Sequence, residues 1–207
     1  MENTANHITL CGVLHTLPAF SHQNHERNFY RFTLAVERLS GAQDLLNVIA
    51  AEDVLDEADL FSGMHITVSG QIRSFNRRHE SGRHLIVSVY ADSVTTTDLP
   101  PENSAALTGV ICKPAIFRRT PLGREICDIM LAVPRLYHRT DYIPCILWGK
   151  TAQTAAACPV GTRLRITGRL QSREYTKILP TGSEKRTTYE LSAAEATPVT
   201  TEDAEIF

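Results

Sequence analysis

Apolar and polar residues alternate with a period of two through most of the chain. The alternation is clearest at 30–36 and at 127–133, where every second residue is apolar. This period predicts strands that bury one face and expose the other. Only two short segments, 50–61 and 149–157, have the spacing of a helix. The pattern therefore predicts an all-β protein with little helix.

The strand pattern occurs twice, because the chain contains an internal repeat. The segment 33–38 recurs as 130–135, and the segment 66–72 recurs as 164–170. A period near 97 residues is too long for a solenoid unit and matches a small domain. The sequence therefore predicts two copies of one domain.

A polar stretch with two adjacent prolines separates the copies. Residues 95–103 include Pro100 and Pro101, which interrupt regular structure, so this stretch is predicted to be a linker. The predicted domains are then 1–94 and 104–199, and residues 200–207 form an acidic C-terminal tip.

Each copy is predicted to have five strands and one short helix between the third and fourth strands. The glycine-bearing polar stretches 79–83 and 180–185 fit the turns of the last hairpins. Five strands and one helix in about 95 residues fit the OB-fold, a small barrel that commonly binds oligonucleotides. A small sandwich with the same number of strands is the alternative. The fold prediction is two tandem OB-folds, each a β-barrel with one short helix.

Composition excludes several classes of protein. The 207 residues are 43% hydrophobic and 21% charged, with a formal net charge of −2, which is ordinary globular usage. The five cysteines include no C-x-x-C pair, and His22 and His25 have no cysteine or carboxylate at a metal-like spacing, so no metal or other cofactor is predicted. No catalytic motif, apolar span or signal sequence is found, which predicts a cytoplasmic protein that is not an enzyme and does not contact a membrane.

The net charge conceals a contrast between the copies. Residues 102–194 carry 14 basic and 7 acidic side chains, whereas residues 1–101 carry 7 basic and 12 acidic ones. A basic excess interleaved with aromatic residues is typical of nucleic-acid binding, and an acidic surface repels phosphate.

The second copy resembles the bacterial single-stranded DNA-binding protein (SSB) family. It contains Trp148-Gly149-Lys150-Thr151-Ala152, and then a strand with Gly161, Gly168 and Leu170 at the spacing typical of that family. Gln153 departs from the pattern, because an acidic residue usually follows the alanine. The resemblance covers nearly all of 104–196 and, weakly, 6–94.

The resemblance implies a binding site for single-stranded DNA in the second copy. Bases would stack on four aromatic residues, Tyr137, Tyr142, Trp148 and Tyr175. Phosphates would contact the basic residues around them, which are Lys150, Arg118, Arg119, Arg163, Arg165, Arg169, Arg173 and Lys177.

The first copy is predicted to be mainly structural, since the matching positions hold Ser40, Leu45, Ala51 and Arg77. Its last hairpin still carries an aromatic residue among arginines, which predicts a secondary DNA contact at Phe75, Arg77 and Arg78.

The resemblance also implies partners. A homodimer would assemble four OB-folds, and the tip residues Glu205, Ile206 and Phe207 would bind replication or repair proteins. The predicted function is therefore sequence-independent protection of single-stranded DNA in replication, recombination or repair, in association with the nucleoid. Two alternatives remain, a protein-interaction or primosome-assembly module that binds DNA weakly, and an RNA-binding protein.

Overall fold

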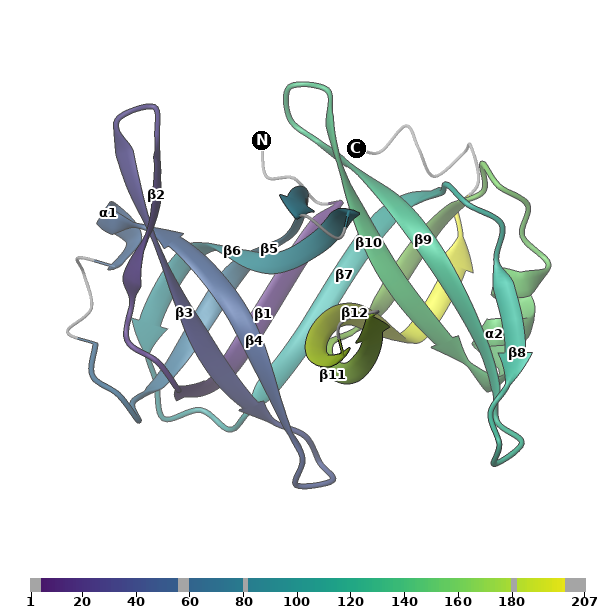
Figure 1. Ribbon diagram of the computed structural model, residues 1–207, viewed down its shortest axis with the longest axis horizontal. Helices are drawn as coiled ribbons and strands as arrows, with labels where there is room; N and C mark the ends of the chain where they lie inside the picture. Colours follow the sequence, from purple (N-terminus) through teal and green to yellow (C-terminus); the bar gives the residue numbers. More distant parts are fainter. Residues whose placement is uncertain (1–4, 56–59, 80–81, 180–181, 200–207) are drawn as a thin grey trace.

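The computed structural model describes residues 5–55, 60–79, 82–179 and 182–199, and strands dominate it (Figure 1). The elements of the first half are β1 (Asn6–Leu14), β2 (Ala19–Asn24), β3 (Arg27–Glu37), β4 (Gln43–Ala51), α1 (Glu52–Leu55), β5 (His65–His79) and β6 (Gly82–Thr96). Those of the second half are β7 (Glu102–Ile111), β8 (Ile116–Arg119), β9 (Glu125–Arg135), β10 (Arg139–Trp148), α2 (Gly149–Ala156), β11 (Arg163–Leu179) and β12 (Gly182–Pro198).

Five strands of each half close into a barrel. In the first half β1 pairs with β3, β3 with β4, β4 with β6, β6 with β5, and β5 with β1 again. All of these pairs are antiparallel except β4 with β6. The strands β7, β9, β10, β12 and β11 form the same ring in the second half. The chain therefore consists of two tandem OB-folds, as predicted.

The apolar residues of the alternating pattern fill the two barrels. Residues related by the repeat are buried in both, at 0–1% exposure, and include Leu10, Leu34 and Ile66 in the first barrel and Leu107, Leu131 and Leu164 in the second. Full burial of such a side chain contributes about 1.5–3 kcal/mol. The period of two thus sets which face of each strand points outward.

Both barrels contain a β-bulge at the same position of the repeat. The strand register shifts between Ser69 and Gly70 in β5, and at the equivalent place in β11, beside Gly168. A Cβ atom at Gly168 would collide with the backbone carbonyl of Ser192 on β12. Both bulges therefore require glycine, which explains why these two glycines recur.

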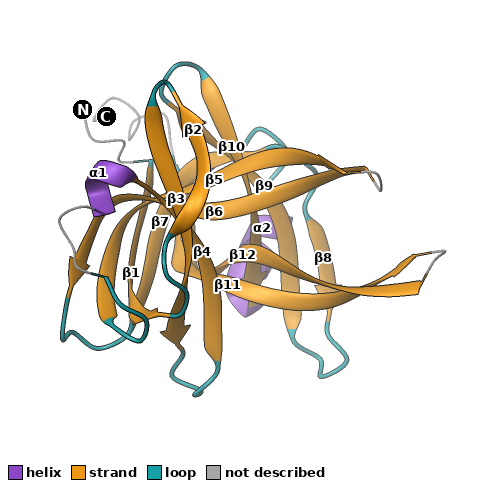
Figure 2. Cartoon of the chain, turned by 60° about the vertical axis from the view of Figure 1, so that its left-hand side comes forward, coloured by secondary structure: helices purple, strands orange, loops and turns teal. Residues whose placement is uncertain are grey.

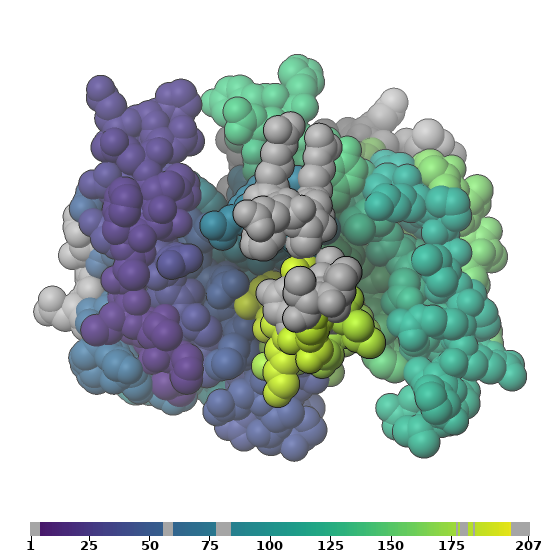
Figure 3. Space-filling view, in the orientation of Figure 1, coloured from purple at the N-terminus to yellow at the C-terminus, as the bar shows by residue number. Residues whose placement is uncertain are grey.

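The two barrels share one continuous sheet. Strand β1 pairs with β7 in antiparallel register, with Ile8 opposite Ala105, so the sheet order passes from one barrel into the other. The long β5–β6 and β11–β12 hairpins extend in the same direction as two arms (Figure 2). The arms touch, because the Arg186 guanidinium lies 3.0 Å from Nδ1 of His84. In Figure 3 the yellow part of the chain that carries the second arm lies over the seam between the barrels.

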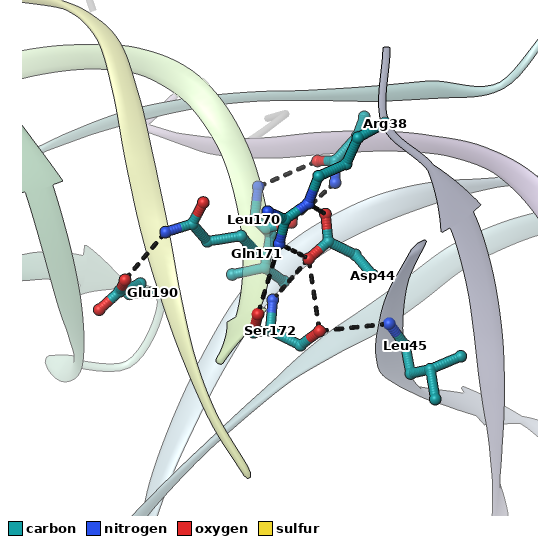
Figure 4. A network of polar contacts seen from close by, with 8 residues as sticks. Arg38, Asp44, Leu45, Leu170, Gln171, Ser172 and Glu190 are labelled. Carbon is teal, nitrogen blue, oxygen red and sulfur yellow. Dashed lines mark hydrogen bonds and ion pairs between the residues drawn. The ribbon is translucent and has the colours of Figure 1, made fainter. Parts of the chain in front are cut away.

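A buried carboxylate from each barrel binds the other barrel. Asp44, which is 1% exposed, accepts a hydrogen bond of 2.7 Å from Arg38 Nε and one of 2.8 Å from the backbone N–H of Ser172 (Figure 4). Asp141, also 1% exposed, accepts the backbone N–H of Ser74 at 2.7 Å. The repeat places Asp44 and Asp141 at equivalent positions. The junction between the barrels is therefore symmetric.

Two details differ from the sequence prediction. The helix predicted at 50–61 is wrong at its start, because Ala50 and Ala51 are buried in β4 and the described helix is only Glu52–Leu55; residues 56–59 lie outside the described ranges. Each half also has one more strand than predicted, β2 in the first and β8 in the second. These edge strands bury no side chain, so they lack an alternating pattern.

Candidate nucleic-acid interface

The outward face of β10 carries two of the predicted aromatic residues. Ile143, Cys145 and Leu147 point into the barrel, whereas Tyr142 and Trp148 are 44% and 37% exposed. Tyr142 and Trp148 are six positions apart, so their Cα atoms lie about 20 Å apart along the strand. Strand β10 therefore presents two exposed rings on one side.

Trp148 is held in place from two directions. Its indole N–H donates to the Ser192 hydroxyl at 3.2 Å on the neighbouring β12. The Thr151 hydroxyl donates to the Trp148 carbonyl at 2.7 Å. Gly149 follows with φ of 54°, a left-handed conformation that glycine adopts without strain and that turns the chain from β10 into α2. The Trp-Gly-Lys motif thus places the indole at the edge between the strand and the helix.

Part of the basic surface lies close to this indole. Arg169 on β11 is exposed and stands opposite Ser192 in the antiparallel register, next to the hydroxyl that holds Trp148. Lys150 is exposed in the first turn of α2. Arg165 and Arg163 are also exposed, but they lie nearer the start of β11, where they face Thr108 and Val110 of β7. Exposed Arg173 stands opposite Thr188, near the arm.

Two of the predicted basic contacts are occupied by carboxylates within the second barrel. Arg118 Nε donates to Asp128 at 2.7 Å, which raises the pKa of the guanidinium. Arg119 donates to Glu125 at 2.8 Å. Glu125 also accepts a hydrogen bond from Gln153, and these two donors lower the pKa of its carboxyl. Strand β8 therefore brings less free positive charge than its sequence suggests.

The other two aromatic residues lie on projecting hairpins. Tyr137 is 89% exposed at the β9–β10 turn, where it has a left-handed φ of 60°. Tyr175 is 40% exposed on the second arm, opposite Arg186. The four rings therefore lie on three separate features, which are the β10 face, the β9–β10 turn and the arm.

Several predicted residues fall outside what the structure describes. The side chains of Lys177 and Arg78 are outside the described set, and so are the tip residues Glu205, Ile206 and Phe207. Arg77 is exposed on the first arm, and Phe75 is 48% exposed beside it.

Two acidic residues of the first barrel, both in α1, are engaged locally. The α1 residue Glu52 accepts hydrogen bonds from Tyr30 at 2.9 Å and Asn28 at 3.0 Å. Asp53 pairs with Arg27 at 2.6 Å, which lowers the pKa of its carboxyl. These two carboxylates of α1 are therefore paired within the first barrel.

Sequence reasoning missed three residues at these surfaces. Ser192 holds the Trp148 indole, Tyr90 lies on the outward face of β6, and Arg139 is exposed at the start of β10. The repeat could have identified the first two, because Tyr90 occupies in β6 the position that Ser192 occupies in β12. Among the described residues no group of three or more His, Cys, Asp or Glu side chains could hold a metal ion.

Comparison with known proteins identifies the family. A family model described as the single-strand binding protein family matches residues 102–199. The chain is 35% identical over 80 residues to the single-stranded DNA-binding protein B of Bacillus subtilis (strain 168), covering 35% of this chain and 71% of that protein. The chain belongs to the single-strand binding protein family. Members of this family are not enzymes, which agrees with the sequence prediction.

Other relatives match over a smaller share of their length. The single-stranded DNA-binding protein of Enterococcus faecalis (strain ATCC 700802 / V583) is 34% identical over 80 residues, which cover 35% of this chain and 43% of that protein. Among solved structures, the wild-type single-stranded DNA binding protein from Thermus aquaticus superposes with a TM-score of 0.77 at 20% identity, covering 94% of this chain and 93% of that one. This likeness shows that the family fold extends over both barrels. In the described ranges no helix is long and apolar enough to cross a membrane.

Proposed function

We propose that the second barrel binds single-stranded DNA without sequence preference. The observation that carries the proposal is the exposed Trp148 indole, held by Ser192 with Arg169 directly across the strand pair. Every base has a π-face that can stack on such a ring, and a guanidinium beside it attracts phosphate. Neither interaction reads the sequence of the DNA.

The remaining aromatic residues extend this site along the barrel. A strand that follows the outward face of β10 would contact Tyr142 and Trp148, and its continuation would reach Tyr137 or Tyr175. Each stacked base contributes about 1–3 kcal/mol. Lys150, Arg163, Arg165, Arg169 and Arg173 are the exposed basic residues that accompany this path, while Arg118 and Arg119 contribute less because they are already paired with carboxylates.

The names of the relatives support the choice of ligand, since the proteins from Bacillus and Enterococcus are both named for single-stranded DNA binding. We infer that this chain protects single-stranded DNA during replication, recombination or repair, and that two chains associate into an assembly of four barrels. The tip at Glu205, Ile206 and Phe207 would bind replication or repair proteins.

Fluorescence anisotropy with labelled oligonucleotides tests the proposal. The full chain is titrated into oligo-dT, a mixed-sequence single strand, the same sequence as RNA, and a duplex. We expect the two DNA single strands to bind within a few-fold of each other, and the duplex to bind far more weakly. Trp148→Ala should weaken binding about 5- to 150-fold, the equivalent of one stacked base. Phe61→Ala is the matched control, because Phe61 is a 61% exposed aromatic residue away from these strands.

Equal affinity for duplex and single strand would contradict the proposal. An unchanged affinity of Trp148→Ala would contradict it as well. A folded chain that ignores all four nucleic acids would indicate that the aromatic face binds a protein, and tighter binding of the RNA strand would favour the RNA-binding alternative.

A further inference from the structure

The first barrel has no aromatic residue at the position that matches Trp148, but it has one, Tyr90, on the adjacent strand. Ala51 stands opposite Phe29 in the same register as Trp148 stands opposite Ile126, so the indole is absent from the first barrel. On the adjacent strand the first barrel has the aromatic residue and the second barrel does not. Tyr90 occupies the position of Ser192, the residue whose hydroxyl holds the Trp148 indole. The first barrel thus carries its ring on β6, whereas the second barrel carries its ring at the end of β10.

Neighbouring rings and a guanidinium support Tyr90. The ring centroid of Phe29 lies 5.6 Å from that of Tyr90, and the His22 ring stacks on Phe29 at 4.9 Å. The guanidinium carbon of Arg73 lies 5.9 Å from the centre of the Tyr90 ring. Burial is the main cause that raises the pKa of the Tyr90 phenol, so the ring stays neutral at physiological pH. This arrangement fixes a neutral ring on the outward face of the first barrel.

Tyr90 lines a pocket that both barrels build. The pocket has a volume of about 540 Å³ and is walled by Tyr90, Phe75 and Arg73 of the first barrel and by Arg135 and Arg139 of the second. The two arginines flank the β9–β10 hairpin turn, which projects at the top of the molecule in Figure 1. Pockets of 300–1,000 Å³ with apolar walls and a few polar groups are typical of small-molecule sites.

Positive charge exceeds negative charge in this pocket. The buried Asp141 carboxylate lies 3.3 Å from Arg73 and 3.5 Å from Arg135, and Asp92 on β6 also interacts electrostatically with Arg73. With Arg139, three guanidinium groups therefore face two carboxylates. Arg139 is exposed, and none of the described carboxylates lies within ion-pair distance of it. An anionic group would therefore be attracted to the arginines of the hairpin.

At one pair of positions the second barrel is more acidic than the first. Gln171 and Glu190 stand opposite each other and share a hydrogen bond of 2.9 Å, where the first barrel has Arg73 and Ser88. The outward face of the first barrel is thus more favourable to phosphate than the acidic composition of residues 1–101 suggests. The described acidic residues of α1, Glu52 and Asp53, are engaged by Tyr30, Asn28 and Arg27.

We propose that this pocket binds one nucleotide of single-stranded DNA, so that the first barrel is a binding element as well as a scaffold. The base packs against Tyr90 and Phe75, and the phosphate lies at Arg135 and Arg139. The pocket then continues the DNA path from the second barrel across the junction. This inference rests on the proposed function, and its test is designed to separate the two.

The test places a fluorescent reporter in each site in turn. Trp148 is the only tryptophan, so the native chain reports on the second barrel. Tyr90→Trp combined with Trp148→Phe moves the only indole into the pocket. Both proteins are titrated with oligo-dT long enough to cross the whole chain. We expect the introduced indole to be quenched at saturation, and Arg139→Gln in this background to weaken that quenching several-fold. Arg124→Gln is the matched control, because Arg124 is an exposed arginine of the β8–β9 turn.

Each combination of results is decisive. Quenching of both indoles supports both proposals. Quenching of Trp148 without quenching of the introduced indole overturns the pocket and leaves the proposed function standing. Quenching of the introduced indole alone supports the pocket and overturns the site at Trp148, and quenching of neither overturns both.

A second measurement uses the native chain, in case the double variant fails to fold. Oligonucleotides that carry 5-bromodeoxyuridine are crosslinked to the protein by ultraviolet light, and the attached peptides are identified by mass spectrometry. Crosslinks at Tyr90 or Phe75 support the pocket. Crosslinks confined to residues 102–199 overturn it.

Discussion

The backbone N–H of Ser74 in the first barrel donates a 2.7 Å hydrogen bond to the buried Asp141 carboxylate in the second. The repeat reproduces this contact in the other direction, since Ser172 donates to Asp44 at 2.8 Å. An aspartate at the same position of each repeat therefore binds the opposite barrel. The same junction lies under Tyr142, whose backbone N–H donates to the Ser74 hydroxyl at 2.7 Å.

Removal of one junction carboxylate should destabilise the whole chain. Asp44→Ala leaves the half-buried Arg38 without its partner and the Ser172 N–H without its acceptor, and we expect a loss of about 3 kcal/mol in the free energy of unfolding. Urea denaturation followed by circular dichroism measures this loss. Asp53→Ala is the control, because the exposed Arg27–Asp53 pair should change stability little. Equal effects of the two substitutions would contradict the account of the junction.

The sequence predicted the barrels well because their determinants are local and repeated. Alternating residues such as Leu34 and Leu131 define the buried faces, and Gly70 and Gly168 recur because both bulges need them. Strands β2 and β8 escaped prediction because exposed edge strands have no alternating pattern.

The site was harder to predict, because its charges depend on pairing between strands. Arg118 looks free in the sequence, yet Asp128, ten residues later, binds it across the β8–β9 pair. Comparison of the four aromatic positions alone also missed Tyr90, because the first barrel has its aromatic residue on β6 and not at the end of β4.

The bulge at Gly168 should affect both stability and the Trp148 site. In Gly168→Ala the new methyl group meets the carbonyl of Ser192, so either β12 shifts or the strands separate. We expect a loss of about 1–3 kcal/mol in stability, together with a changed Trp148 emission because Ser192 moves. Gly123→Asn is the control, since that left-handed turn position has open space and asparagine tolerates its φ of 78°. Thermal unfolding and emission spectra of both variants provide the check; native emission from Gly168→Ala would rule out the link between the bulge and the indole.

Salt dependence should distinguish free arginines from paired ones. Arg169→Gln removes an exposed guanidinium beside the Trp148 site, so the slope of log affinity against log salt should become shallower by about 0.7. Arg118→Gln should change the slope less, because Asp128 already neutralises Arg118. Oligo-dT titrations at several salt concentrations measure both slopes. If Arg118→Gln lowers the slope as much as Arg169→Gln, the ion pair does not limit the contact of Arg118 with DNA.

The cysteines should differ in reactivity by burial. Cys145 is 2% exposed, and burial raises the pKa of its thiol far above the ordinary value, so the reactive thiolate does not form in the folded chain. Iodoacetamide at pH 8.5 should therefore label the half-buried Cys158 and leave Cys145 unmodified until urea is added. Mass spectrometry of the digested protein reads out both sites. Labelling of Cys145 at the rate of Cys158 without denaturant would show that the second barrel opens readily.

The most direct test of the central claim is a titration of the native chain with poly-dT, with Trp148 fluorescence as the readout at low and moderate salt. The indole lies on the proposed path of the bases, so the account predicts strong saturable quenching at low salt that added salt reverses. Unchanged Trp148 emission at low salt, from a chain that is folded by circular dichroism, would contradict it.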